Sequence, residues 1–251
     1  MILRIIDESL RVAWSDICYL RRNFLMVMVT ILVTPLLYFI AFGYGLGNEV
    51  GSIEGVSYIA FVIPGIVSLS TLTSTFSSTA NKIMVQRRFY SSFDEIVLCP
   101  ISPSSVVIGK TAVGFVRGVL GCSVLLALGM LMSDDMNVNA LLVACVLISC
   151  FAFSLLGVLA GFMAKDLPTM TLFSSLVIVP MTFLCGTLFS LSSLPSVAKH
   201  VISALPLTHA TSCIRAAALD RPFPIDSLII LMAFGTAFFL LSYYLLKQGK
   251  V

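Results

Sequence analysis

Few residues in this sequence combine the types and the spacing that catalysis requires. Ile108–Thr111 reads IGKT and imitates the end of the phosphate-binding loop G-x-x-x-x-G-K-[ST]. The first glycine of that loop would fall at Ser104, so Lys110 is better interpreted as marking the inner end of an apolar helix. The two histidines, His200 and His209, have no nucleophile or carboxylate at a spacing that suggests a catalytic triad. The sequence therefore predicts no catalytic residue and no ATPase motif in this chain.

Metal and cofactor binding is not indicated either. Metal sites need clustered donors, and the cysteines are scattered without a C-x-x-C pair. The seven cysteines are Cys18, Cys99, Cys122, Cys145, Cys150, Cys185 and Cys213. Asp134 and Asp135 lie in the polar stretch MSDDMNVN, where paired carboxylates usually belong to a solvated loop. We expect no metal and no bound cofactor; a disulfide between Cys185 and Cys213 stays open.

A charged segment, QRRFYSSFDEIVLCPISPSSVVIGK (Gln86–Lys110), interrupts an otherwise apolar sequence. As one helix over 84–98 it has an apolar face of Val85, Phe89, Phe93, Ile96 and Val97. The opposite face carries Arg87, Arg88, Ser91, Asp94 and Glu95. Pro100 and Pro103 end the helix. Such a helix either lies on the membrane surface or forms a knob that a soluble partner grips, with aromatic anchors and charges that set the register.

The composition requires a membrane around these residues. Hydrophobic residues make up 59% of the 251 residues and charged ones 11%, with a mean hydropathy of +1.06. A spanning helix needs roughly 20 apolar residues. Six segments of that kind are predicted at 24–44, 56–80, 105–131, 139–163, 169–190 and 226–246. The predicted fold class is an all-α integral membrane protein in a single domain, 1–251.

The basic residues predict the orientation of these six spans. With both termini in the cytoplasm, 12 of the 15 Lys and Arg residues lie inside, and Lys199, Arg215 and Arg221 lie outside. Topology alone thus explains the net charge of +3, and no nucleic-acid partner is expected. Residues 1–22 lack the pattern of a cleavable signal, and 2–20 place apolar residues at helical spacing. We expect a retained helix along the inner membrane surface, with Trp14 among the lipid headgroups.

Four segments resemble ABC-2 type transporter permeases, in the family's order and spacing. Arg87–Lys110 is similar to the coupling region, an arginine-containing helix before L-x-x-P-[IV]-[ST] and a G-K start to the third span. Tyr58–Ile66 (YIAFVIPGI) resembles Y-x-x-F-x-x-P-G of the second span. Phe183–Pro195 (FLCGTLFSLSSLP) and Leu205–Ala217 (LPLTHATSCIRAA) resemble F-L-S-G-x-x-F-P-x-x-x-L-P and P-L-T-H-x-x-x-x-x-R. Ser190 departs from the proline that many relatives have there. The polysaccharide-export, nodulation-factor and multidrug permeases are the most similar branch.

The resemblance implies an architecture and a set of partners. Such permeases pair as two six-span subunits, a type V exporter-like arrangement, and each coupling helix docks into a separate ATP-binding cassette ATPase. ATP and Mg²⁺ then bind in the partner, and the membrane lipids surround the dimer in the cell (plasma or inner) membrane. The resemblance also implies outer re-entrant helices, expected over 191–218. The residues expected to couple to the ATPase are Arg87, Arg88, Phe89, Phe93, Asp94 and Glu95.

The expected function is export of a lipidic, drug-like or lipid-linked glycan substrate. The second and fifth spans are expected to line the path, with Ser70, Ser74, Ser77, Thr182 and Phe183 as path residues. The many hydroxyls of the second span equally suit close helix packing, and both interpretations stay open. The alternative function is an ATP-independent carrier or channel, although the predicted spans hold no acidic residue beyond Asp226, the first residue of the sixth. An integral membrane enzyme lacks a candidate set of catalytic residues.

Overall fold

The computed structural model describes residues 2–38, 40–41, 52–53, 56–90, 92–132, 137–187 and 202–249. They form a helical bundle with one two-residue hairpin, β1 (Ser52–Ile53) paired antiparallel with β2 (Val56–Ser57). The longer helices are α1 (Ile2–Arg22), α2 (Phe24–Tyr38), α4 (Tyr58–Arg88), α6 (Pro103–Met132), α7 (Ala140–Met163), α11 (Pro206–Ala218) and α12 (Ile225–Lys247). Shorter elements are α5 (Ser92–Leu98), α8 (Leu167–Phe173), the π-helix η2 (Ser174–Ile178) and α9 (Val179–Leu184). The expected all-α class is confirmed.

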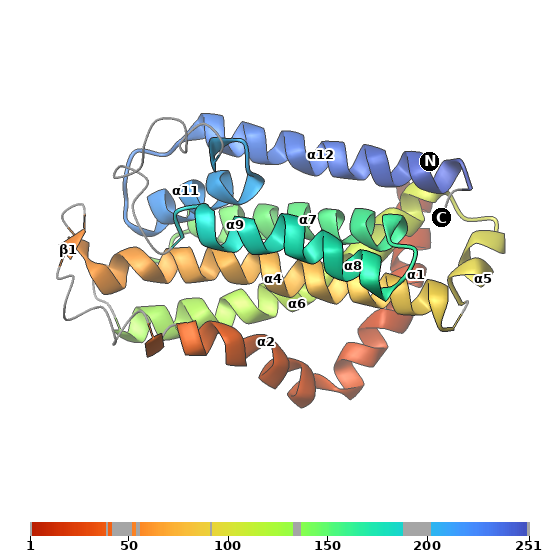
Figure 1. Ribbon diagram of the computed structural model, residues 1–251, viewed down its shortest axis with the longest axis horizontal. Helices are drawn as coiled ribbons and strands as arrows, with labels where there is room; N and C mark the ends of the chain where they lie inside the picture. Colours follow the sequence, from red (N-terminus) through yellow and green to blue (C-terminus); the bar gives the residue numbers. More distant parts are fainter. Residues whose placement is uncertain are drawn as a thin grey trace.

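The number of membrane-length helices agrees with the sequence pattern. Within the described residues five helices are long and apolar enough to cross a membrane, and six if α1 and α2 count as one bent span. The axes of α1 and α2 meet at 83° around Asn23. In Figure 1, α5 and the end of α12 lie at one end of the bundle, and β1 and the start of α12 at the other. We call these the α5 end and the β1 end.

Helix α4 runs through the middle of the bundle and is buried on most of its surface (Figure 1). Helices α6 and α7 approach it closely because glycines face it. A Cβ added at Gly114 would lie 2.7 Å from the carbonyl oxygen of Thr75, and one at Gly157 would lie 2.9 Å from that of Phe76. The Thr79 hydroxyl is 2.9 Å from the Ser154 hydroxyl, which donates to the carbonyl of Thr111. Small residues at helix contacts are what packing inside a membrane favours.

The fifth expected span is a continuous helix, Leu167–Leu184, with a π-helical segment in its middle. Helices α8 and α9 are joined by the π-helix η2, and Pro180 lies in the first turn of α9. Proline lacks the backbone N–H of the i→i−4 ladder, so a local π-type rearrangement next to it is physically reasonable. Asp166 caps the start of α8 by accepting from the backbone and hydroxyl of Thr169. The span ends at Leu184, and Gly186 follows with a positive φ of 65°.

At the β1 end, α11 folds back into the bundle. Its 13 residues are too few to span the bilayer and are mostly buried. The Arg215 guanidinium lies 3.8 Å from the ring centre of Phe61 and donates to the carbonyls of Gly186 and Thr187. Part of the expected re-entrant segment, 191–201, lies outside the described residues. Cys185 and Cys213 are both buried free cysteines.

The expected single helix over 84–98 is interrupted in the structure. Helix α4 continues to Arg88, residues 89–90 form a turn, and α5 begins at Ser92. The helix therefore bends at the place where the sequence pattern was continuous. This break separates the surroundings of Phe89 from those of Phe93, with consequences for the candidate site.

Candidate functional site

The end of α4, the turn after it and α5 form a protruding corner, residues 87–90 and 92–99, which we call the α4–α5 corner. Two side chains fasten it to the bundle. Arg87 Nη1 donates to the carbonyls of Gly161 (2.7 Å) and Phe162 (2.8 Å) at the end of α7. Cations are favoured at helix C-termini, where carbonyls lack intrahelical partners. The Phe93 ring is 1% exposed and lies edge-on to Phe162, with 5.5 Å between ring centres.

These contacts change the roles expected for two residues. Phe93 and Phe89 do not share a face, because Phe93 packs in the core of the chain while Phe89 is 62% exposed. In this chain the Phe93 ring is therefore not exposed to a partner, and the Arg87 guanidinium is hydrogen-bonded to α7. The physical reason is the break after Arg88, which rotates α5 relative to α4.

The outer surface of the corner is apolar with charges beside it. Its exposed apolar side chains are Phe89, Tyr90, Val97 and Leu98. Arg88, Asp94 and Glu95 are also exposed. An exposed apolar patch with a charged border is typical of a protein interaction site. Sequence periodicity found Phe89 and Val97 but missed Tyr90 and Leu98, because they follow no single helical face.

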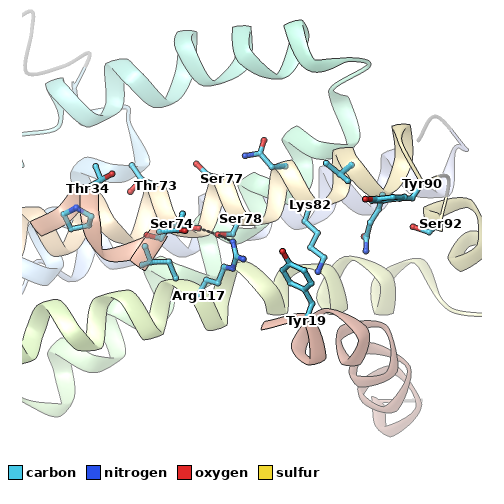
Figure 2. A pocket seen from close by; sticks show the side chains of 16 residues that line it. Tyr19, Thr34, Thr73, Ser74, Ser77, Ser78, Lys82, Tyr90, Ser92 and Arg117 are labelled. Carbon is cyan, nitrogen blue, oxygen red and sulfur yellow. Dashed lines mark hydrogen bonds between the residues drawn. The ribbon is translucent and has the colours of Figure 1, made fainter. Parts of the chain in front are cut away.

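A cavity of about 780 Å³ begins at this corner and extends along α4. Tyr90 and Ser92 line it at the corner, and Thr73 and Thr34 line its far part (Figure 2). Its walls come from α1, α2, α4, α6 and the start of α5. From Tyr90 to Thr73 the rise along α4 is roughly 25 Å at 1.5 Å per residue. The cavity therefore links the corner to the middle of the bundle.

The hydroxyls of α4 divide between packing and cavity. Thr71, Thr75 and Thr79 are buried against neighbouring helices, so the packing interpretation describes that side. Ser74 and Ser77, both expected path residues, line the cavity with Thr73 and Ser78. The other expected path residues do not line it. Ser70 is 1% exposed and 3.5 Å from the Ser74 hydroxyl, whereas Thr182 and Phe183 lie on α9.

Two cations of the cavity were not singled out by sequence reasoning. Arg117 lies within α6, and its Nη1 donates to the Ser78 hydroxyl at 3.2 Å. Lys82 lies 4.5 Å from the ring centre of Tyr19 and 2.9 Å from Asp16. Figure 2 shows Arg117 and Tyr19 pointing toward α4, and Lys82 pointing toward Tyr19. The orientation argument counted Arg117 as an inner flanking residue, yet it lies roughly 10 Å farther along α6 than Lys110. An ionisable residue inside a predicted span was the available signal.

Beside the cavity, a buried ion-pair cluster joins three helices. The Asp16 carboxylate of α1 is 2.9 Å from Lys82 Nζ of α4 and 3.3 Å from Lys110 Nζ of α6. Gln86 donates to Asp16 and accepts from Lys110 at 2.8 Å. Lys110 is thus neither a phosphate-loop lysine nor a simple flanking charge. It fastens α6 to α1.

A second polar contact holds the start of α1. Glu8 accepts from the backbone N–H of Ser102 (3.1 Å) and from the hydroxyl of Ser105 (2.8 Å), at the N-terminus of α6. These hydrogen bonds lower the pKa of Glu8 from 4.5 to about 2. A lowered carboxyl pKa means that the contact is fully present above pH 4.5 and is lost as the pH falls through 2. The opposite side of α1 exposes Ile6, Leu10 and Trp14, which suits a membrane surface.

Comparison with known proteins agrees with the architecture over nearly the whole chain. The chain is 26% identical over 247 residues to the inner membrane transport permease YadH of Escherichia coli (strain K12), covering 96% of each chain. It is 29% identical over 245 residues to nodulation protein J of Rhizobium meliloti (strain 1021), covering 94% of each. Nodulation protein J of Sinorhizobium fredii is 26% identical over 217 residues, 83% of each. The sequence model of the ABC-2 type transporter family matches residues 11–219. This match covers most of the helical bundle, and the chain belongs to the ABC-2 type transporter family.

Proposed function

We propose that this chain is the transmembrane permease subunit of an ATP-binding cassette exporter. It moves an amphipathic substrate (lipidic, drug-like or a lipid-linked glycan) outward, with ATP and Mg²⁺ bound and hydrolysed by a separate subunit. The carrying observation is the α4–α5 corner, whose exposed Phe89, Tyr90, Val97 and Leu98 stand on a firmly fastened base. The family membership and the similarity to a named transport permease support the same function.

The corner suits the transmission of force from a partner. Because Arg87 binds the end of α7 and Phe93 packs on Phe162, a displacement of the corner moves α4 and α7 together. A rigid contact transmits displacement, whereas a loose loop absorbs it. Tyr90 and Ser92 carry the same displacement to the mouth of the cavity. We propose that closure of the ATPase pair tilts α4 and reshapes the cavity along it.

Purification of the tagged chain from the membranes of its own source tests the proposal. We expect recovery of Mg²⁺-dependent ATP hydrolysis, and a mass that fits two copies of this chain with two ATPase subunits. The chain produced alone serves as the control and should hydrolyse no ATP. A mass that fits one copy of this chain with one ATPase subunit would contradict the proposed pairing of two copies. Substrate movement that continues without nucleotide would favour the ATP-independent carrier instead.

In the proposed orientation the protein lies in the inner membrane with its α5 end in the cytoplasm. Arg88, Lys165 and Lys247 lie in or beside the helix ends there, as the preference of basic residues for the inside requires. Exposed Cys99 of this end offers a native probe once Cys18 is changed to serine. A membrane-impermeant thiol reagent should label Cys99 in inside-out vesicles and leave it unlabelled in sealed cells.

The matched control places the thiol at the β1 end. Asp226 is exposed in the first turn of α12, so Asp226→Cys in a chain with Cys18→Ser and Cys99→Ser should react in sealed cells. The reverse labelling pattern at the two positions would overturn the orientation.

A further inference from the structure

The cavity along α4 carries positive charge inside the bundle. Arg117 projects into it from α6, and among the described residues its one hydrogen bond to a side chain, at 3.2 Å, goes to the neutral hydroxyl of Ser78. Its Nε is buried and has no hydrogen-bond partner among the described residues. A guanidinium held away from water without an anion costs free energy. The arrangement therefore favours an anionic group as the missing partner.

The neighbouring charges do not cancel that of Arg117. Asp16 is shared between Lys82 and Lys110, so the cluster of these three residues keeps one net positive charge. Lys82 lines the same cavity as Arg117. No Asp or Glu is among the lining residues in the part of the chain that the structure describes. An anion in the cavity would thus meet two positive charges from two different helices.

The polar lining has the chemistry of an oxyanion site. The Ser78 hydroxyl donates to the carbonyl of Ser74, so its lone pairs face Arg117 and hold the guanidinium in place. Thr34, Ser77 and Tyr19 add further hydroxyls to the walls. A phosphate group offers at least three strong acceptor oxygens and matches the planar donor fork of arginine. A carboxylate would use fewer of these donors.

The wall on the α2 side indicates where an apolar tail would lie. Helix α2 buries Val27, Ile31 and Pro35 toward the bundle, while Leu25, Met26, Val29 and Val33 are exposed on its outer side. Thr30, Ile31 and Thr34 of the same helix line the cavity. One helix therefore separates the cationic cavity from the lipid chains. The tail of a molecule with its anionic head in the cavity would have to pass beside α2 to reach the bilayer.

We propose that this cavity binds the phosphate-type head of an amphipathic molecule, with Arg117 as its main ligand and Lys82 as the second cation. The proposal rests on the export function and deepens it by naming the chemical class of the substrate head. The cavity extends from Arg117 to the α5 end of the bundle, which the proposed orientation places at the inner leaflet, the source of the molecule. Ser78 acts as a positioning residue for Arg117.

Binding of radiolabelled dodecyl phosphate to the full chain in maltoside micelles tests the proposal without any ATPase. Unlabelled dodecyl phosphate should displace the label, and dodecyltrimethylammonium, with the same tail and the opposite charge, should not. Arg117→Gln should weaken the affinity about ten- to hundredfold, as expected for loss of a charge-assisted contact. Arg117→Lys, which keeps the charge without the fork, should fall between the two. Arg22→Gln removes an exposed arginine at the end of α1 and should bind like the wild type.

Each outcome decides a different point. Displacement by millimolar inorganic phosphate would identify a soluble phosphate compound as the source, and displacement only by dodecyl phosphate would identify a lipid head. Equal binding of the phosphate and ammonium amphiphiles by the wild type overturns the proposal, even if the Arg117 variants fail to fold. Equal affinity of wild type and a folded Arg117→Gln chain also overturns it. The binding assay contains no ATPase, so it is independent of the export function. If the chain binds the phosphate amphiphile but recovers no ATPase on purification, only the export function is refuted.

Discussion

Replacing Asp16 with alanine should lower the free energy of unfolding by about 3–5 kcal/mol, the usual cost of removing one partner of a buried ion pair. The Asp16 and Lys110 side chains are 2% and 1% exposed, so the change leaves Lys110 charged and buried without its carboxylate. Lys82 loses its 2.9 Å contact at the same time. Chemical unfolding in mixed micelles measures the effect. We expect α1 to separate from α6 first, because Asp16 joins them.

Two control variants isolate the buried charge. Asp7→Ala removes a carboxylate from the same helix. This carboxylate pairs with Arg11 at the surface, where the Asp7 and Arg11 side chains are 63% and 79% exposed. An exposed pair of this kind should cost less than about 1 kcal/mol. Combining Asp16→Ala with Lys110→Met removes both buried charges and should recover part of the lost stability. Equal effects of Asp7→Ala and Asp16→Ala would contradict the cluster as the link between α1 and the bundle.

The two phenylalanines of the α4–α5 corner should respond to alanine in opposite ways. Phe93→Ala empties a core position against Phe162 and should destabilise the fold by about 3–5 kcal/mol. Phe89→Ala removes a 62% exposed ring and should change stability by about 0.5 kcal/mol or less. Phe89→Ala should instead weaken ATPase binding by about 2 kcal/mol or more, which is roughly 30-fold in affinity.

Paired measurements of unfolding and of ATPase affinity on both variants check this division. Glu95→Ala, at an exposed charged position beside the patch, is the graded control, and its effect on affinity should be smaller and sensitive to salt. If Phe89→Ala binds the ATPase with the affinity of the wild type, the α4–α5 corner is not the docking site. If Phe93→Ala has the same free energy of unfolding as the wild type, Phe93 does not hold the corner on the bundle.

The helical class and the family were predictable from the sequence because they depend on long-range composition and on motifs spread along the chain. The membrane-length apolar segments do not depend on any precise contact. The break after Arg88 was not predictable, because apolar spacing through Val85, Phe89 and Phe93 fits one uninterrupted helix. The turn allows Phe93 to pack on Phe162, a residue of another helix, and a contact between helices is not visible in sequence spacing.

The sequence indicated only some of the residues that line the cavity, again because contacts between helices cannot be predicted from spacing. Ser74 and Ser77 were expected path residues from the hydroxyl content of their helix, and both line it. Ser70 has the same residue type but is enclosed by neighbours, which sequence spacing cannot reveal. The cluster of Asp16, Lys82 and Lys110 joins residues from three helices. From the sequence, Lys110 was interpreted only as the inner end of an apolar helix.

Cross-linking from the α4–α5 corner tests most directly whether this chain is driven by an ATPase that docks there. In the purified complex with Cys18→Ser, Cys99 is the exposed thiol in the described part of the chain, and it takes a maleimide that carries a photoreactive group. Illumination should give a covalent adduct with the mass of this chain plus one ATPase subunit. The same reagent on Asp226→Cys, in the chain with Cys18→Ser and Cys99→Ser, should give no such adduct. Absence of the adduct from Cys99, or equal yields from the two positions, would contradict the account.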